Sequence, residues 1–205
     1  MDTLANTRRR AEKLYLGYAG RRAALKARTP VAQPPAEGEI FTTHDGVRLL
    51  LRDIHPDDVQ ALQRGFAGLT PEEVRFRFLH PLTELPEALA RRLCDIDPQH
   101  AVALVLIDTP GTREPEIHAV ARAFIDPVTL SAEFALIVQH RLAGHGVGTL
   151  LMQRLIAACR KLGAVELWGD VLAENSTMLE LCEHLGFSRH PAFEDPGVIR
   201  VTLPL

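Results

Sequence analysis

The sequence predicts a single mixed α/β domain in which helices flank one sheet. Two observations favour this class. Apolar runs typical of strands alternate along the chain with stretches whose apolar residues recur at helical spacing. In addition, 205 residues with 46% hydrophobic content suffice for one domain with a substantial core, but not for two large ones. We therefore expect one sheet with helices packed against it.

The composition argues against several classes of protein. A net charge of −3 gives no sign of a nucleic-acid binder, and no run of about 18 apolar residues predicts a membrane span. The first residues lack the apolar segment of a secretory signal, so we expect a cytoplasmic protein. Cys94, Cys159 and Cys182 have apolar neighbours and lack zinc-site spacing, which predicts buried thiols. We expect no metal site.

Residues 1–39 differ from the rest of the chain. Up to Thr29, eight basic side chains are opposed only by Asp2 and Glu12, and the apolar residues have helix-like spacing. A stretch rich in proline follows, so we predict a basic helical tail and a linker over 1–39, and a folded domain over 40–205. A solvated or packed helix is one interpretation of the tail; contact with nucleic acid or anionic lipid is the alternative.

Within the domain, the strand and helix signals follow one another without an internal repeat. Apolar or alternating runs predict strands at 47–52, 101–107, 117–125, 132–138, 165–171 and 198–203. Helix-start signals stand at 55–58, at Thr70-Pro71 and at Leu85-Pro86. Two further helices are predicted, one after a glycine cluster and ending at Gly163, the other over about 176–185.

The glycine cluster consists of Gly144, Gly146 and Gly148, between a predicted strand and a predicted helix. A helix N-terminus presents unpaired N–H groups and a partial positive charge, and glycine lets a phosphate approach them closely. The spacing fits neither a P-loop nor a dinucleotide-binding fingerprint. A pyrophosphate cradle is one interpretation, and a glycine-rich turn that packs strand against helix is the other.

The surrounding residues carry a resemblance to a known family. Residues 141–146, R-L-A-G-H-G, resemble the R/Q-x-x-G-x-G/A motif of the GNAT N-acetyltransferases. The downstream Asn175…Leu181…Gly186-Phe187 resembles that family's N…L-Y-x-x-x-G-F segment. Residues 44–58, 69–78, 96–105 and 132–138 are similar to landmarks of the acetyltransferase domain in bacterial protein-lysine acetyltransferases. The resemblance covers about 40–190. It implies the GNAT fold, with a mostly antiparallel sheet, a splayed strand pair and flanking helices.

The resemblance also implies acetyl-CoA as co-substrate and a set of residues that bind it. Backbone amides would hold the pyrophosphate, and main-chain groups of the strand at 132–138 would hold the pantetheine arm. Asn175 would bond the cofactor, cap the following helix, or do both. Carried over by position, the cofactor-binding residues are Leu136, Ile137, Val138, Arg141, Gly144, His145, Gly146, Val147, Gly148, Thr149 and Asn175.

A carboxylate on the central strand is the general base that the resemblance implies. A lysine acceptor is mostly an ammonium at pH 7, and its deprotonation costs roughly 4–5 kcal/mol. Glu133 is the only charge in 131–138, where we expect burial to raise its pKa. A solvent-facing glutamate is the alternative interpretation. His118, Glu116 and Asp126 are the other candidate bases.

The sequence departs from the family at Cys182, which stands where many relatives have a tyrosine that serves the leaving thiolate. This puts a side-chain general acid in doubt, and a plain core thiol is the interpretation we favour. The predicted function is acetyl transfer from acetyl-CoA to an amine, with a protein that exposes a lysine side chain as the expected partner. The alternatives are a small-molecule amine as acceptor, and a non-catalytic acyl-CoA-binding regulatory module.

Overall fold

The computed structural model describes residues 38–79, 82–192 and 195–205. Within them, eight strands form one sheet in the order β1-β2-β3-β4-β5-β6-β8-β7. Neighbouring strands are antiparallel except β5 and β6, which are parallel. This confirms the predicted fold class. The strands are β1 (Glu39–Thr42), β2 (Arg48–Asp53), β3 (Ala101–Asp108), β4 (Ile117–Ile125), β5 (Ser131–Val138), β6 (Glu166–Leu172), β7 (Ser188–Pro191) and β8 (Val198–Pro204).

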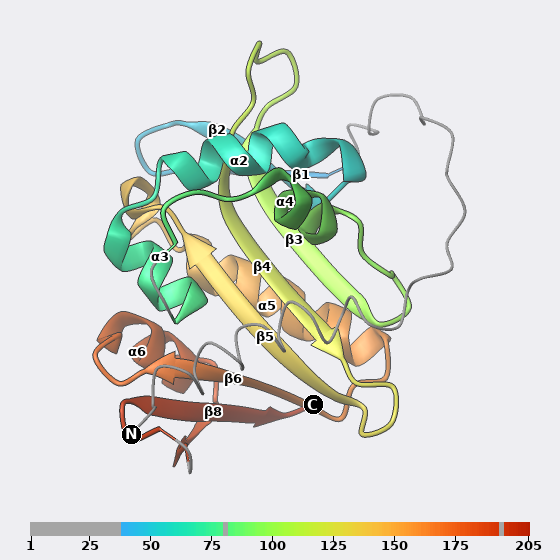
Figure 1. Cartoon of the computed structure of the whole chain (residues 1–205), viewed down its shortest axis with the longest axis vertical. Helices are drawn as coiled ribbons and strands as arrows, with labels where there is room; N and C mark the ends of the chain where they lie inside the picture. The colour runs from blue at the N-terminus through green and yellow to red at the C-terminus, as the bar shows by residue number, and fades with distance from the viewer. Residues whose placement is uncertain (1–37, 80–81, 193–194) are drawn as a thin grey trace.

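Helices cover both faces of the sheet (Figure 1). On one face, α2, α3 and α4 pack over β2 to β5; on the other, α5 crosses behind β4 and β5, and α6 lies beside β6. The helices are α2 (Val59–Ala67), α3 (Pro71–Phe78), α4 (Glu87–Cys94), α5 (Val147–Lys161) and α6 (Ser176–His184), with the short 3-10 turns η1 (Pro56–Asp58) and η2 (His140–Leu142).

The sheet separates two apolar cores. Successive side chains of a strand point to opposite faces, so β5 contributes Ala132 and Phe134 to the core beneath α5 and α6, and Ile137 to the core beneath α2 to α4. Helix α2 approaches β4 closely because residue 65 is glycine: a Cβ there would lie 2.0 Å from the Ile117 carbonyl oxygen.

The elements agree with the sequence predictions except at the margins. Thr70 caps α3 in a capping box with Glu73, as its sequence signal indicates. The signal at 55–58 opens first the 3-10 turn η1 and only then α2. Two strands were not predicted, β1 and β7. Both are four-residue edge strands with mostly exposed side chains, so neither has the apolar run that marks a buried strand.

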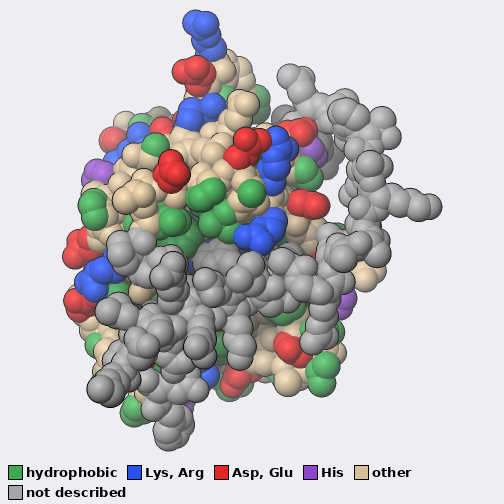
Figure 2. Space-filling model, in the orientation of Figure 1, with side chains coloured by type: hydrophobic (Ala, Val, Ile, Leu, Met, Phe, Trp, Pro, Cys, Tyr) green, Lys and Arg blue, Asp and Glu red, His purple; other side chains and the backbone are tan. Residues whose placement is uncertain are grey.

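The surface of the helical layer carries both signs of charge. Figure 2 shows acidic and basic side chains interspersed over this layer, with apolar side chains between them. None of the helices in the described ranges combines the length and the apolar character needed to cross a bilayer. The predicted basic tail and linker lie outside the described residues, apart from Gly38 and Glu39.

Candidate active site

The sheet splits between its two parallel strands. β5 and β6 pair only at Ser131↔Glu166, Ala132↔Leu167 and Glu133↔Trp168. Beyond that point β5 continues to Val138 against β4, and β6 continues to Leu172 against β8. No described strand pairs with the edge of β5 that faces β6 from residue 134 onward. The two strands therefore bound a wedge whose apex lies at Glu133, and this wedge is the splayed strand pair that the family resemblance implied.

An aromatic ring lies at the point where the strands diverge. The Phe134 ring lies against the main chain of Gly169, where a Cβ would come within 2.7 Å of it. The ring also packs edge-on against Phe187, with centroids 5.4 Å apart. A side chain at 169 would compete with this ring for the same space. Gly169 thus lets β6 run beside the bulky residue that follows the apex.

The open end of the wedge carries the glycine cluster at the start of α5. Gly144 and Gly146 have φ of 77° and 76°, which favour glycine, and a Cβ at either position would project into open space. The backbone ladder of α5 begins with the Leu150 N–H, which donates to the Gly146 carbonyl at 3.0 Å. The N–H groups of residues 147–149 precede this bond and point out of the helix N-terminus.

The third glycine has a different role. A Cβ at Gly148 would lie 3.2 Å from Leu181 Cδ2 and 3.7 Å from Leu136 Cδ2. This glycine therefore lets α6 and β5 pack against the first turn of α5. The packing interpretation thus holds for Gly148, whereas Gly144 and Gly146 shape an open loop whose role in binding stays a prediction. We call residues 143–149 the cradle.

The acyl-CoA cofactor implied by the fold fits this arrangement. The cradle offers main-chain donors with open space in front of them, which suits a diphosphate. Along β5, the side chains of Leu136 and Val138 pack into one core and that of Ile137 into the other, which leaves their main chain as the group that faces the wedge. Asn175 Oδ1 accepts from the Met178 N–H at 3.1 Å, so this side chain caps α6.

The predicted cofactor residues Arg141 and His145 are held by neighbouring side chains. Arg141 donates to Glu116 Oε1 and to Gln139 Oε1, each at 2.7 Å, and contacts His118 Nδ1. The His145 ring stacks on His44, with centroids 5.7 Å apart, and its Nδ1 accepts from the His44 N–H at 3.4 Å. The turn between β1 and β2 thus lies against the cradle.

Glu133 stands at the apex of the wedge. Ala132 and Leu167 face the core beneath α5, so Glu133 and its register partner Trp168 face the opposite side of the sheet. Glu133 is half-buried and has interaction partners within the protein. On the same side, Arg200 lies 4.2 Å from the Trp168 ring centroid and makes two 2.9 Å bonds to Asp170. The sequence signalled no role for Trp168 or Arg200, because only the β6–β8 register brings them together.

The other candidate bases lie elsewhere. Asp126 Oδ1 accepts from the Val128 and Thr129 N–H groups, at 2.8 and 3.0 Å, in the turn between β4 and β5. His118 and Glu116 belong to a polar cluster beside η2, at the cradle end of the wedge. Among the four candidates, Glu133 is the one that the strand register places at the apex.

Cys182 is a core thiol. It has no exposed surface, lies in the cluster beneath α5 and α6, and burial raises the pKa of its thiol to about 12. The interpretation that we favoured from its apolar neighbours therefore agrees with its burial. Cys94 and Cys159 are also buried and free.

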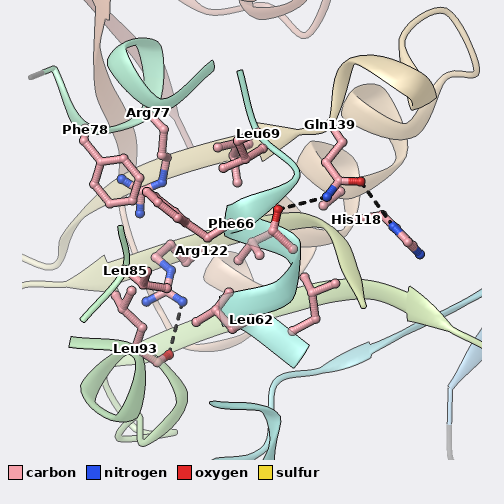
Figure 3. Close-up of a pocket in the computed structure, with 15 residues that line it drawn as sticks. Leu62, Phe66, Leu69, Arg77, Phe78, Leu85, Leu93, His118, Arg122 and Gln139 are labelled. Carbon is pink, nitrogen blue, oxygen red and sulfur yellow. Dashed lines mark hydrogen bonds between the residues drawn. The ribbon is translucent and has the colours of Figure 1, made fainter. Parts of the chain in front are cut away.

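A small cavity lies on the Glu133 side of the sheet, between α2–α4 and the strands β4 and β5 (Figure 3). Its volume is about 50 Å³. Apolar side chains form most of the wall, with Arg77 and Arg122 toward one end and His118 and Gln139 toward the other. Arg122 donates to the Leu93 carbonyl at 3.1 Å. Ile137 links the two sites, because its main chain borders the wedge and its side chain lines the cavity.

Comparisons with known proteins identify the class and the family. The sequence model of the acetyltransferase (GNAT) family matches residues 69–187. An acetyltransferase of Pseudomonas aeruginosa is 31% identical over 145 residues, which is 70% of this chain and 76% of that protein. The GNAT domain of S. lividans PAT is 25% identical, covers 84% of this chain and 99% of its own, and superposes with a TM-score of 0.73.

A further solved structure shares the fold alone. A cAMP-binding acyltransferase from Mycobacterium smegmatis is 23% identical over 82% of this chain, with a TM-score of 0.55, and the match spans 48% of that protein. Taken with the split sheet, these findings define an acyltransferase that uses acyl-CoA and an amine acceptor. The chain belongs to the GNAT family and is an acetyltransferase.

Proposed function

We propose that the protein transfers acetyl from acetyl-CoA to the side chain of a lysine in a protein, with Glu133 as general base. The observation that carries this proposal is the divergence of β5 and β6 directly after Glu133. It places one carboxylate at the closed end of a wedge whose open end is the cradle. A cofactor held at the cradle and extended along β5 would lead toward that carboxylate.

The wedge and cradle residues divide the work. The amides of residues 147–149 would bind the diphosphate, and the main chain of 136–138 would orient the arm. Acetyl-CoA, when bound, supplies an activated thioester carbonyl. Glu133 would take the proton from the lysine ammonium, which lowers the roughly 4–5 kcal/mol cost of presenting a neutral amine at pH 7. As the N–C bond forms and the C–S bond breaks, the nitrogen loses its second proton to the departing thiolate, so that no proton from Cys182 is required.

The lining of the cavity beside β5 favours a lysine on a macromolecule over a small free amine. The described residues around it form a mostly apolar wall with Arg77 and Arg122 and include no carboxylate, so they offer no counter-charge to a small ammonium compound. A lysine side chain on a partner's surface needs no enclosing pocket, because the rest of the substrate stays outside. The similar GNAT domain of S. lividans PAT supports a protein acceptor by analogy.

Incubation with labelled acetyl-CoA tests the proposal. The protein and a Glu133→Gln variant would each be mixed with a bacterial cytosolic proteome, and label would be followed in proteins and in metabolites. We expect protein-bound label that resists hydroxylamine, as an amide does, and that depends on Glu133. Label confined to small amines would support the metabolite alternative. Cofactor binding without transfer would support a regulatory module.

A further inference from the structure

A buried polar cluster joins the segment that precedes the cradle to β3, β4 and α2. Two of its members are almost fully buried: His118 is 7% exposed and Gln139 2%. His118 Nε2 lies 2.8 Å from Asp108 Oδ1, and Gln139 Nε2 donates to the Gly65 carbonyl at 3.0 Å and to Glu116 Oε1 at 2.7 Å. Figure 3 shows His118 and Gln139 facing each other at one end of the cavity.

Arg141 determines the direction of the hydrogen bonds in this cluster. A guanidinium group only donates, so His118 Nδ1, which Arg141 Nη2 contacts, must accept. His118 then carries its proton on Nε2 and donates it to Asp108. Gln139 Oε1 accepts from Arg141 Nε at 2.7 Å. His118 Nδ1 and Gln139 Oε1, which lie 3.2 Å apart, are therefore both acceptors, and Arg141 is the donor to both.

The cluster holds the segment from which the cradle extends. Gln139 is bonded to β4 through its main chain as well, since its N–H donates to the His118 carbonyl at 3.0 Å. The neighbouring His140 N–H donates to Glu73 of α3. The loop beyond contains two glycines at positive φ, which restrict the backbone little by themselves. Anchors at 139–141 thus limit the freedom of the cradle on its N-terminal side.

We propose that His118 is a positioning residue for the cofactor site. By accepting from Arg141 while Asp108 fixes its tautomer, it holds η2, and with it the cradle, in the conformation that binds the diphosphate. This rests on the proposed role of the cradle. A loop held in its binding conformation loses less conformational freedom on association, so the cluster should strengthen cofactor binding and leave the chemical step unchanged.

Two amide substitutions separate the two sides of the imidazole. Asn places its amide at the position of Nδ1, so His118→Asn keeps an acceptor for Arg141 and loses Asp108. Gln places its amide at the position of Nε2, so His118→Gln keeps Asp108 and loses Arg141. We expect His118→Gln to raise the Kd for CoA about tenfold, and the KM similarly, with kcat unchanged; His118→Asn should stay within about threefold of wild type.

Calorimetric titration with CoA measures the affinity without catalysis. Thermal unfolding measures the loss of stability that both variants share because the packing around residue 118 changes. Equal Kd values for the two variants would overturn the proposal, since a purely structural histidine gives no such difference. If both variants fail to fold, Glu116→Ala provides the test, because Glu116 is partly exposed and accepts from both Gln139 and Arg141. The Kd of the Glu116→Ala variant for CoA should rise severalfold, and an unchanged Kd would overturn the proposal. A wild-type protein that binds no CoA would instead contradict the proposed function.

Discussion

The two ends of the β5–β6 wedge differ in what the chain supplies. At the cradle, the proposed functional groups are main-chain amides, and they are left open because Gly144 and Gly146 carry no side chain. At the apex, the proposed functional group is one side chain, Glu133, held where two strands stop pairing. A main-chain site is altered by substitutions that change the backbone conformation or cover the amides, whereas a side-chain site is altered by exchanging atoms on an unchanged backbone. Substitutions should therefore affect binding at one end and chemistry at the other.

Removing the proposed base should have the largest effect. Glu133→Gln keeps the shape of the side chain and removes its capacity to accept a proton. We expect kcat to fall by roughly 10²–10⁴-fold, the range for a lost general base, while the Kd for CoA stays unchanged. Steady-state release of CoA and calorimetry measure the two quantities.

Glu166→Gln is the matched control for this substitution. Glu166 is a carboxylate on β6 in the paired segment that precedes the apex, where it accepts from the Ser131 hydroxyl at 3.2 Å. The Glu166→Gln variant should retain nearly full activity. A Glu133→Gln enzyme as fast as wild type would remove Glu133 from the mechanism.

At the cradle, the sharpest test compares the two ends of α5. Gly146 and Gly163 have φ of 76° and 80°, and a Cβ at either would enter open space. Alanine should cost about 1–2 kcal/mol of stability at both positions, because both would adopt the left-handed region. Only Gly146→Ala puts a methyl group over the cradle, so it alone should weaken CoA binding, by about tenfold. Equal Kd values for the two variants would show that the diphosphate does not lie at the cradle.

The point where β5 and β6 diverge can be tested at Gly169. A Cβ there would lie 2.7 Å from the Phe134 ring, so Gly169→Ala should destabilise the protein by about 1–3 kcal/mol, the usual cost of overpacking. Thermal unfolding measures this loss. Phe134→Leu in the same chain should recover part of it, because the smaller side chain vacates that space. Strictly additive losses in the double variant would mean that the two positions do not compete.

The sequence was informative about the cradle and much less so about the apex. Glycines ahead of a helix are compatible with an anion site through local rules, so the residue pattern predicted either such a site or a packing turn, and the family resemblance favoured the anion site. That Gly148 serves packing against Leu181 depends on tertiary structure. Glu133 was chosen through family resemblance, and the register with Trp168 that makes it an apex residue joins segments far apart in the chain.

The polar cluster around His118 shows the same limit. Asp108, His118 and Gln139 come from separate segments, and no spacing in the sequence links them to Arg141. Arg141 was expected beside the cofactor, and the structure shows its guanidinium tied to Glu116 and Gln139. Helix and strand periodicity predicted the buried elements well. It missed the edge strands β1 and β7, because exposed strands carry no apolar pattern.

The smallest effect on activity should follow substitution of Cys182. Its thiol is fully buried, so Cys182→Ala should leave kcat within about twofold of wild type. A large loss of kcat with unchanged stability would instead assign the thiol a catalytic role.

Burial raises the pKa of Cys182 and Cys94 to about 12 and that of Cys159 to about 11, whereas an unfolded thiol titrates near ~8.5. Because the folded pKa values are the higher ones, the unfolded chain loses these protons first. The free energy of unfolding should be unaffected by the thiols below about pH 8.5 and should fall as the pH rises toward 11–12. Denaturant titrations between pH 7 and 10 measure this slope. The Cys182→Ala variant should show a shallower one, since it lacks one of the three buried thiols.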